Sequence, residues 1–378
     1  MSDHGRKLAT AIGAISGTSM DGVDVALIRS DGEARLETGP GATYPYPTEI
    51  AAALRAVVAD PPRAAGPLIK LEAAVTDAHV AAIERFLGEF AIDRRAVEIV
   101  GLHGQTVLHR PEERFTRQLC DGARAAAALS IDVVNDFRSA DVAAGGEGAP
   151  LAPLYHAAMC AELDKPTAVL NLGCVGNVTY LGRAGEIVAF DTGPANALMD
   201  DFVRRRLGLP YDEDGRVAAT GLADARVVAA LMDDPYFDRL PPKSLDRNHF
   251  HAAATRAVES LADADGAATL LAFTIEATAA AARHFAGAPA RWLVCGGGRR
   301  NSELMNNLAA RLATHVEAIE AIGFDGDVIE AQCFGYLALR SRAGLPISLP
   351  TTTGAPRPLT GGRFSPADPG RATKRRSR

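Results

Sequence analysis

The segment Phe190-Asp191-Thr192-Gly193-Pro194-Ala195-Asn196 places an acid at the end of an apolar strand and just before a helix. An acid in that position is partly desolvated, yet it lies within reach of the first amides of the helix. Asp191 could therefore act as a general base in catalysis. Asp191 or Thr192 could instead cap the helix. The sequence leaves both interpretations open.

Two glycine-rich turns could bring backbone amides close to a ligand. The segment SGTSMDG, which begins at Ser16, combines glycines with hydroxyls and can wrap phosphate oxygens without a lysine, although an ordinary hairpin turn has the same composition. Gly296, Gly297 and Gly298 stand between a strand and a helix, where they would let a flat ligand or a phosphate chain approach the backbone. Neither turn has the P-loop or the Rossmann glycine pattern.

Hydrogen-bonding side chains gather in the segment LHGQTVLH, which begins at residue 102. Gly104 permits a bend after a buried strand, and this bend would present Gln105 and Thr106 to a hydroxyl-rich ligand. His103 could equally be a structural histidine at a strand end. His103 and His109 lack the spacing of a helical metal pair, and no cysteine lies near enough to complete a zinc site.

Two charged residues complete the set. Arg138 has a planar guanidinium that can grip a carboxylate or a phosphate at two points, or it can pair with an aspartate at a domain boundary. Glu330 opens the last long helix and would face either a ligand or solvent.

Short apolar runs alternate with Ala-rich stretches, which predicts an α/β protein with largely buried sheets. We expect strands at residues 8–15, 22–29, 98–102, 167–172, 177–181, 186–190 and 291–295. We expect helices at residues 48–59, 68–87, 123–129, 152–163, 195–207, 218–232, 267–285, 302–312 and 331–343. Asp191 and the triple glycine then lie where strands end, and Glu330 lies where a helix begins.

One pattern occurs twice along the chain. A strand, a small-residue turn and a second strand stand near the N-terminus, and the same order returns from residue 167. This repetition predicts a duplicated fold of two lobes with a ligand cleft between them. We expect an N-terminal lobe at 1–150, a C-terminal lobe at 151–345 and an extension with a frayed basic tail at 346–378.

Length and composition agree with two lobes and exclude several classes of protein. The chain has 378 residues, 47% of them hydrophobic, which is enough for two cores. Its net charge of −6 argues against nucleic-acid or anionic-lipid partners. No run approaches the roughly 20 apolar residues of a membrane helix. Five cysteines without a CxxC pair, and no signal-peptide core, predict a reduced cytoplasmic protein.

Taken together, these segments resemble the anhydro-N-acetylmuramic acid kinases, members of the sugar kinase/Hsp70/actin superfamily. The resemblance rests on stretches that follow the family's order, namely GTSMDGVDVAL, HGQTVLH, NDFRSADVAAGGEGAPLAP, NLGCVGNVT, FDTGPANALMD, PPKSLDRNHF, VCGGGRRNSELM and TTTGAP. It implies two RNase H-like, actin-like ATPase lobes with ATP and sugar meeting in the cleft, and a homodimer. The implied reaction opens the 1,6-anhydro bridge of anhydro-N-acetylmuramic acid by hydrolysis and phosphorylates O6, in murein recycling and amino-sugar catabolism.

The resemblance also implies residue roles. Asp191 would be the catalytic base. ATP would be bound by Gly17, Thr18, Ser19, Met20, Asp21, Gly22, Val23, Asp24, Asn177, Gly296, Gly297 and Gly298. The sugar would be bound by His103, Gln105, Thr106, Arg138 and Glu330. Because there is no P-loop lysine, Mg²⁺ would supply charge compensation, held by Asp21 and Asp24 through water.

The chain departs from the family pattern at a few positions. Cys174 and Ala195 each stand where glycine is usual, Gly176 stands where alanine is common, Ser139-Ala140 reduce an arginine-rich stretch, and Glu147 replaces a glutamine. These departures bear on the second phosphate turn and on specificity more than on the fold. Two alternatives follow: a kinase of another small carbohydrate or carboxylate on the same fold, or an ATP-binding protein without turnover. The HGQT and NDFR segments oppose the first alternative, and Asp191 opposes the second.

Overall fold

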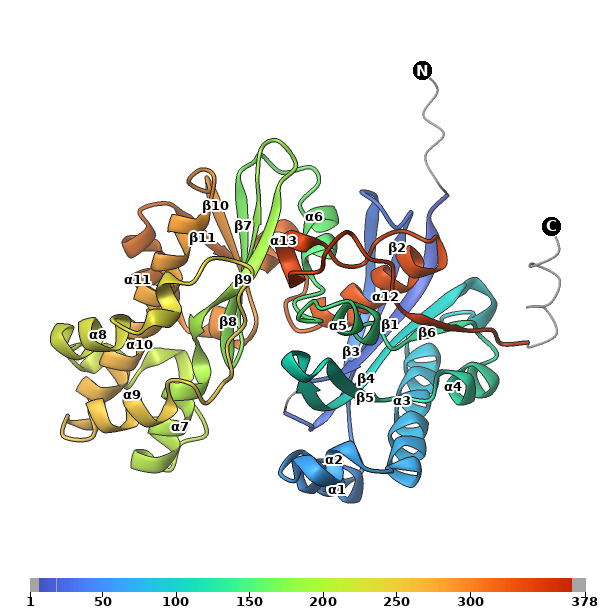
Figure 1. Cartoon of the computed structure of the whole chain (residues 1–378), viewed down its shortest axis with the longest axis horizontal. Coiled ribbons are helices and arrows are strands. Elements are labelled where there is room, and N and C mark those ends of the chain that lie inside the picture. Colours follow the sequence, from blue (N-terminus) through green and yellow to red (C-terminus); the bar gives the residue numbers. More distant parts are fainter. Residues whose placement is uncertain (1–6, 18, 369–378) are drawn as a thin grey trace. The chain divides into compact units, whose positions relative to one another are not determined.

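The computed structural model describes residues 7–17 and 19–368, which divide into two compact units (Figure 1). The first unit contains the described residues up to Ala161 and those from Val328 onward. The second unit contains Glu162–Asp327. These limits differ from the boundaries that we predicted at residues 150 and 345.

The first unit is built on a mixed sheet with the strand order β12-β6-β4-β1-β2-β3, and β5 pairs with β4 beside this path. Strands β1, β2 and β3 are antiparallel neighbours, whereas β4 runs parallel to β1 and β6 runs parallel to β4. The strands are β1 (Ala9–Ser16), β2 (Gly22–Ser30), β3 (Leu36–Pro45), β4 (Ile99–Arg110), β5 (Phe115–Leu119), β6 (Val133–Asn135) and β12 (Arg363–Ser365).

Helices α3 and α4 contribute to an apolar core against this sheet. Along α3 the buried side chains follow helical spacing, as Val75, His79, Ala82, Ile83 and Phe86 show, so one stripe of the helix is buried. The helices of this unit are α1 (Thr48–Val58), α2 (Pro61–Ala65), α3 (Ile69–Glu89), α4 (Gly122–Leu129), α5 (Ser139–Ala143), α6 (Pro153–Met159), α12 (Ile329–Arg342) and α13 (Pro350–Thr353), with short 3₁₀ turns η1 (Arg94–Ala96) and η2 (Pro111–Glu113).

Helix α12 belongs to the first unit because glycines let it lie directly on the sheet. A Cβ added to Gly13 in β1 would stand 1.7 Å from the Ala331 carbonyl oxygen, and one added to Gly101 in β4 would stand 2.0 Å from that of Phe334. Only glycine permits such an approach between a strand and a helix backbone. The contact fixes the first turn of α12, which carries Glu330, over the centre of this sheet.

The second unit repeats the strand topology of the first. Its sheet has the order β11-β10-β7-β8-β9, in which β7, β8 and β9 are antiparallel neighbours and β10 and β11 add parallel strands. The strands are β7 (Thr167–Leu172), β8 (Val175–Leu181), β9 (Ile187–Pro194), β10 (Arg291–Cys295) and β11 (His315–Ala318). Three antiparallel strands followed by two parallel ones form the RNase H-like pattern, and its recurrence confirms the predicted duplication.

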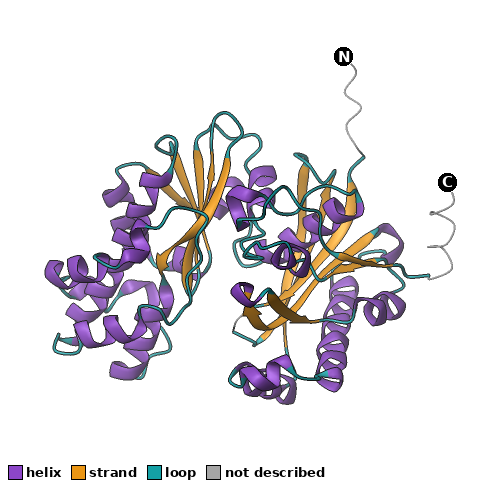
Figure 2. Cartoon of the chain, viewed as in Figure 1, coloured by secondary structure: helices purple, strands orange, loops and turns teal. Residues whose placement is uncertain are grey.

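Helices pack against the sheet of the second unit (Figure 2). Their core includes Leu170, Val178 and Phe190 from the sheet and Phe202 and Phe273 from α7 and α10. The helices are α7 (Asn196–Leu207), α8 (Ala225–Met232), α9 (His251–Val258), α10 (Asp263–Ala281) and α11 (Ser302–Leu312), with 3₁₀ turns η3 (Glu213–Gly215), η4 (Ala218–Thr220), η5 (Pro235–Asp238), η6 (Ala282–His284), η7 (Gly297–Arg300) and η8 (Ile319–Ile322).

Most predicted elements are present, and the differences have local causes. The helix predicted at 218–232 is divided, because η4 ends at Thr220 and α8 begins only at Ala225, after Asp224 caps it. Strand β3 was not predicted, since most of its side chains are exposed or only half-buried and it contains two glycines. Within the described residues, no helix is long and apolar enough to cross a membrane.

Candidate functional site

The turn between β1 and β2 is tight and tied to the body of the first unit. Ser16 ends β1 and its hydroxyl donates to Gln105 Oε1 at 2.5 Å. Met20 has a φ of 53°, and the Asp21 carbonyl accepts the Tyr46 amide at 2.9 Å. Thr18, predicted to bind ATP, lies outside the described residues. The described part of the turn is therefore anchored at both ends.

The two acids proposed to hold a metal through water both lie in this region. The Asp21 side chain is exposed and accepts the Ser19 hydroxyl at 2.7 Å. Asp24, on β2, accepts the Thr43 hydroxyl from β3 at 2.6 Å. Within residues 7–17 and 19–368, no group of three or more His, Cys, Asp or Glu side chains is placed to hold a metal ion. A cation here would take most of its ligands from water or from a bound nucleotide.

The predicted sugar-binding segment is part of β4, which continues to Arg110 instead of ending at Leu102. Gly104 has a φ of 73° and coincides with a register shift against β1, so the predicted bend is a bulge within the strand. Gln105 is only 2% exposed, and its amide nitrogen donates to the Thr106 carbonyl at 3.1 Å. Both ends of the Gln105 amide are thus bound within the unit.

His103 and Arg138 form a defined pair. The Arg138 Nε donates to His103 Nε2 at 3.0 Å, and the guanidinium also donates to the Gly148 carbonyl at 2.7 Å. Because an arginine Nε always carries its proton, His103 Nε2 must be the acceptor and His103 Nδ1 carries the hydrogen toward the Gly104 carbonyl, 3.0 Å away. His103 is therefore a neutral acceptor that orients Arg138.

Electrostatics support this assignment. Burial, followed by the positive charge of Arg138, holds the pKa of His103 well below its usual value. The His103 ring lies 4.4 Å from that of Phe334 on α12. Glu330, one turn before Phe334, is exposed to solvent. Desolvation by the surrounding protein, followed by the negative charge of Asp24, raises the pKa of Glu330, whereas the positive charge of Arg138 lowers it.

A loop secures Arg138 from the other side. Asp141 is 2% exposed and accepts the Gly148 amide at 2.7 Å and the Thr353 hydroxyl at 2.7 Å. Among the described residues, no carboxylate lies within ion-pair distance of Arg138. The pairing of Arg138 with an aspartate, which we kept as an alternative, is therefore wrong. Its charge remains available to an anionic ligand.

In the second unit, Asp191 lies inside β9 and does not cap a helix. Strand β9 continues to Pro194, and the N-cap residue of α7 is Ala195, which has no side-chain cap. The register places Asp191 opposite Asn177 on β8, and Asn177 opposite Asn171 on β7. These three polar residues alternate with core residues, so their side chains line the face of the sheet opposite the helix-covered core.

Asp191 is held by a segment to which the sequence analysis assigns no role. Its Oδ2 accepts the Leu245 amide at 2.8 Å, its own amide donates to the Lys243 carbonyl at 3.0 Å, and its carbonyl accepts the Tyr236 hydroxyl. The PPKSLDRNHF stretch, one of those on which the family resemblance rests, supplies two of these contacts. In the sequence, the feature that could have indicated this segment is Lys243, which directly follows two prolines.

The first amides of α7 bind backbone carbonyls of the β7–β8 turn. The Ala195 and Ala197 amides donate to the Cys174 carbonyl at 3.2 and 3.3 Å, and the Asn196 amide donates to the Gly173 carbonyl at 2.9 Å. The Cys174 side chain is exposed. The start of α7 is thus occupied by the protein and is not the phosphate site that a helix N-terminus can form.

The triple glycine lies between β10 and α11. Gly296 has a φ of 74°, and a Cβ there would stand 2.3 Å from Asn171 Oδ1. A Cβ on Gly298 would stand 2.6 Å from that of Leu172, whereas one on Gly297 would meet nothing closer than 3.5 Å. Gly296 and Gly298 are therefore required by contact with β7, and Gly297 is the position with room for a ligand.

A pocket of about 530 Å³ lies beside this turn. Its lining includes Gly297 and Gly298 together with Asp200, Tyr211, Asp214 and Arg300. The volume suits a nucleoside, and the mixture of one aromatic ring with polar groups suits a base and a ribose. Desolvation raises the pKa of Asp200 to about 6, against the opposing effect of Arg204.

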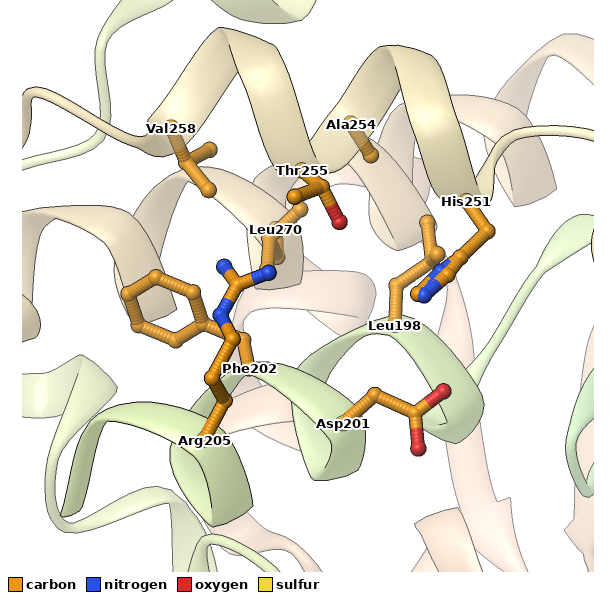
Figure 3. A pocket seen from close by; sticks show the side chains of 9 residues that line it. All are labelled: Leu198, Asp201, Phe202, Arg205, His251, Ala254, Thr255, Val258 and Leu270. Carbon is orange, nitrogen blue, oxygen red and sulfur yellow. The ribbon is translucent and has the colours of Figure 1, made fainter.

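A second cavity of about 80 Å³ lies between α7 and α9 (Figure 3). Phe202 lies across from Val258, Leu198 lies near His251, and the Arg205 guanidinium lies between these two ends. This volume is far below that of a nucleotide or sugar site. Of these two cavities, only the one beside the glycine turn has a volume in the range of a nucleoside site.

Two units with RNase H-like sheets of the same strand topology define a duplicated α/β fold. The family model for anhydro-N-acetylmuramic acid kinase matches residues 9–367. A relative with that name from Paramagnetospirillum magneticum is 51% identical, and the match covers 93% of this chain and 98% of the relative. Another, from Rhodospirillum rubrum, is 49% identical, and the match covers 94% of each chain. The chain belongs to the anhydro-N-acetylmuramic acid kinase family.

Among solved structures, the activator of 2-hydroxyisocaproyl-CoA dehydratase from Clostridium difficile, with bound ADPNP, covers 89% of this chain and 96% of its own. Its sequence identity is 10% and its TM-score is 0.47.

Proposed function

We propose that this protein is an ATP-dependent kinase that hydrolytically opens 1,6-anhydro-N-acetylmuramic acid and phosphorylates O6, giving N-acetylmuramic acid 6-phosphate. The observation that carries the proposal is the placement of Asp191 inside β9, with one carboxylate oxygen fixed by the Leu245 amide. A carboxylate that a backbone amide holds in place, on the sheet face opposite the core, suits a general base. We place the reaction in the cytoplasm, as part of murein recycling.

Asp191 would take a proton from the water that attacks C1. The new C1–O bond forms as the bond between C1 and O6 breaks, and O6 attacks the γ-phosphorus of ATP to release ADP. The carboxylate also stabilises the positive charge that develops at the anomeric carbon. General-base assistance of this kind typically contributes about 10²- to 10⁴-fold in rate.

Arg138 would bind the lactyl carboxylate of the sugar. Its Nε is held by His103 and one Nη by the Gly148 carbonyl, so the guanidinium has a fixed plane. A fixed plane favours two-point binding of a carboxylate, and no described carboxylate competes for it. Glu330 would accept a hydrogen bond from the free ring hydroxyl of the sugar. Gln105 and Thr106 would contribute to sugar binding by holding the β4 bulge in its shape.

Two sets of residues are candidates for binding ATP. The nucleoside would occupy the pocket beside Gly297, and the turn from Gly17 to Asp24, with Asn177, would hold the phosphates. Mg²⁺ would be held by Asp21 and Asp24 through water, and it would neutralise phosphate charge. The donors fit such an ion, because Asp21 is exposed, Asp24 is only half-buried, and Mg²⁺ keeps several waters. The homodimer stays a prediction, which light scattering tests.

The two alternatives are not favoured. A kinase of another acceptor and an ATP-binding protein without turnover both conflict with a family match over nearly the whole chain. In this chain the Cys174 side chain is exposed, and the Ala195 amide donates to the Cys174 carbonyl.

The decisive assay measures ADP release with anhydro-N-acetylmuramic acid, N-acetylmuramic acid or N-acetylglucosamine as acceptor. We expect turnover with the first sugar only and, in H₂¹⁸O, label at the anomeric hydroxyl and not in the phosphate. Asp191→Asn should lower kcat at least about a hundredfold with a modest change in KM. Asp224→Asn is the matched control, because asparagine also caps α8. An active Asp191→Asn enzyme, or label in the phosphate, would refute the mechanism.

A further inference from the structure

Residues 235–245, which we call the Asp191 clamp, form hydrogen bonds with both the main chain and the carboxylate of Asp191. Tyr236, in η5, donates its hydroxyl to the Asp191 carbonyl. At the other end of the clamp, the Lys243 carbonyl accepts the Asp191 amide and the Leu245 amide donates to the carboxylate. The clamp thus fixes the main chain of residue 191 and one side-chain oxygen together.

Lys243 joins the two ends of the clamp. Its Nζ donates to the Tyr236 carbonyl at 3.1 Å and to the Phe237 carbonyl at 3.2 Å, and the residue is only 5% exposed. The ammonium also lies 4.6 Å from the centre of the Tyr236 ring and 5.7 Å from that of Phe190, the residue before Asp191. A cation between two rings and two carbonyls is a specific packing element.

The charges around Lys243 make it an unusual place for a lysine. Within the described residues, no carboxylate forms an ion pair with it, whereas Arg283 and Arg239 lie near enough to repel it and Asp238 to attract it. Burial and these arginines lower the pKa of Lys243 to about 8. Arg283 donates to the Phe237 carbonyl and pairs with Asp238 at 3.3 Å, and His284 follows it on η6. A buried ammonium that is repelled by neighbouring arginines is stable only where its contacts offset the free-energy cost of burial.

We propose that Tyr236 and Lys243 are positioning residues for Asp191, acting through the clamp and without contact to substrate. The inference rests on the proposed function in so far as Asp191 is the base. A base must be held within about 0.5 Å of its productive position, because a 1 Å displacement can lower a rate about 10²-fold. Tyr236 fixes the backbone of Asp191, and Lys243 keeps the two ends of the clamp at a constant separation.

The kinetic test uses Tyr236→Phe and Lys243→Met. Each removes hydrogen bonds with little loss of volume, and each should lower kcat about tenfold while the KM values for ATP and sugar stay within about twofold. The matched controls are Tyr180→Phe, a buried tyrosine on β8, and Lys165→Met, whose Nζ also donates to a carbonyl. Both controls should keep kcat. A drop in kcat that equals the loss of folded protein, or a rise in the KM for ATP instead, overturns the proposal.

A second measurement does not depend on activity. Hydrogen exchange followed by mass spectrometry should show faster exchange of the peptide that contains the Leu245 amide in Tyr236→Phe and Lys243→Met, and not in either control. The double variant should lose little more than the Lys243 variant, because both act on one clamp. Unchanged exchange overturns the clamp even if the enzyme is active. An inactive wild-type enzyme with the expected exchange result overturns the proposed function alone.

Discussion

The substitution His103→Phe tests whether the histidine acts through Arg138. Phenylalanine keeps a ring against Phe334. It removes His103 Nε2, which in the wild-type protein accepts the Arg138 Nε proton at an N–N distance of 3.0 Å. A hydrogen bond to a charged group contributes about 1.5–3 kcal/mol, and an unpartnered guanidinium proton will be satisfied by rotation of the side chain. Since 1.4 kcal/mol is a factor of ten in binding, the KM for the sugar should rise about 10- to 100-fold.

The assay is ADP release with the sugar varied at saturating ATP, repeated with ATP varied. We expect kcat to fall less than about threefold and the KM for ATP to stay constant, since Arg138 binds substrate and does not take part in proton transfer. His315→Phe, at an exposed histidine on β11, is the control and should change neither constant. The reasoning is wrong if His103→Phe leaves the KM for the sugar unchanged while the protein remains folded. It is also wrong if the wild-type KM titrates near pH 6.5, because the pKa of His103 lies well below that value.

Three further outcomes follow from single contacts. Gly101→Ala should destabilise the protein by at least about 1–3 kcal/mol in chemical denaturation, because its Cβ would meet the Phe334 carbonyl, whereas Gly88→Ala, on α3 with nothing within 4 Å, should stabilise by up to about 1 kcal/mol. Asp200 has a pKa raised to about 6 from 3.8, so between these values the folded state binds more protons and stability falls as pH rises; Asp200→Asn should therefore raise Tm above pH 6 and lose that advantage below pH 4. Ellman's reagent should label Cys174 first, since the other four cysteines are buried, and Cys174→Ala should keep kcat because the Cys174 carbonyl, not its thiol, binds α7.

The sequence indicated candidate residues but could not show what each of them contacts. The sequence left open whether Asp191 is a catalytic base or a helix cap. The structure excludes the cap, because β9 continues to Pro194, where the Gly-Pro pair had indicated a turn. The triple glycine was attributed to a ligand, yet Gly296 and Gly298 are explained by β7, whose residues are distant in sequence. Contacts of that kind leave no periodic signal in a single chain. The roles of these residues in binding stay predictions.

The domain boundary was missed for a similar reason. Helix α12 follows the second sheet in the chain, so proximity in sequence assigned it to the second lobe. The signal against that assignment was the glycine in each of two apolar strands, Gly13 and Gly101, which marks a close backbone approach. The partner of these glycines, more than 200 residues further on, could be identified only from the packing.

The two units share a strand topology, but the proposed roles differ with the groups that hydrogen bonds within each unit already occupy. In the second unit, the amides of α7 bind the Gly173 and Cys174 carbonyls, and the Lys243 ammonium binds the Tyr236 and Phe237 carbonyls. Neither group is then available to neutralise the phosphates of a nucleotide. Phosphoryl transfer nevertheless requires that charge to be compensated. We therefore predict that other groups supply this compensation. The turn from Gly17 to Asp24, with a divalent cation held through water, is our candidate for that role.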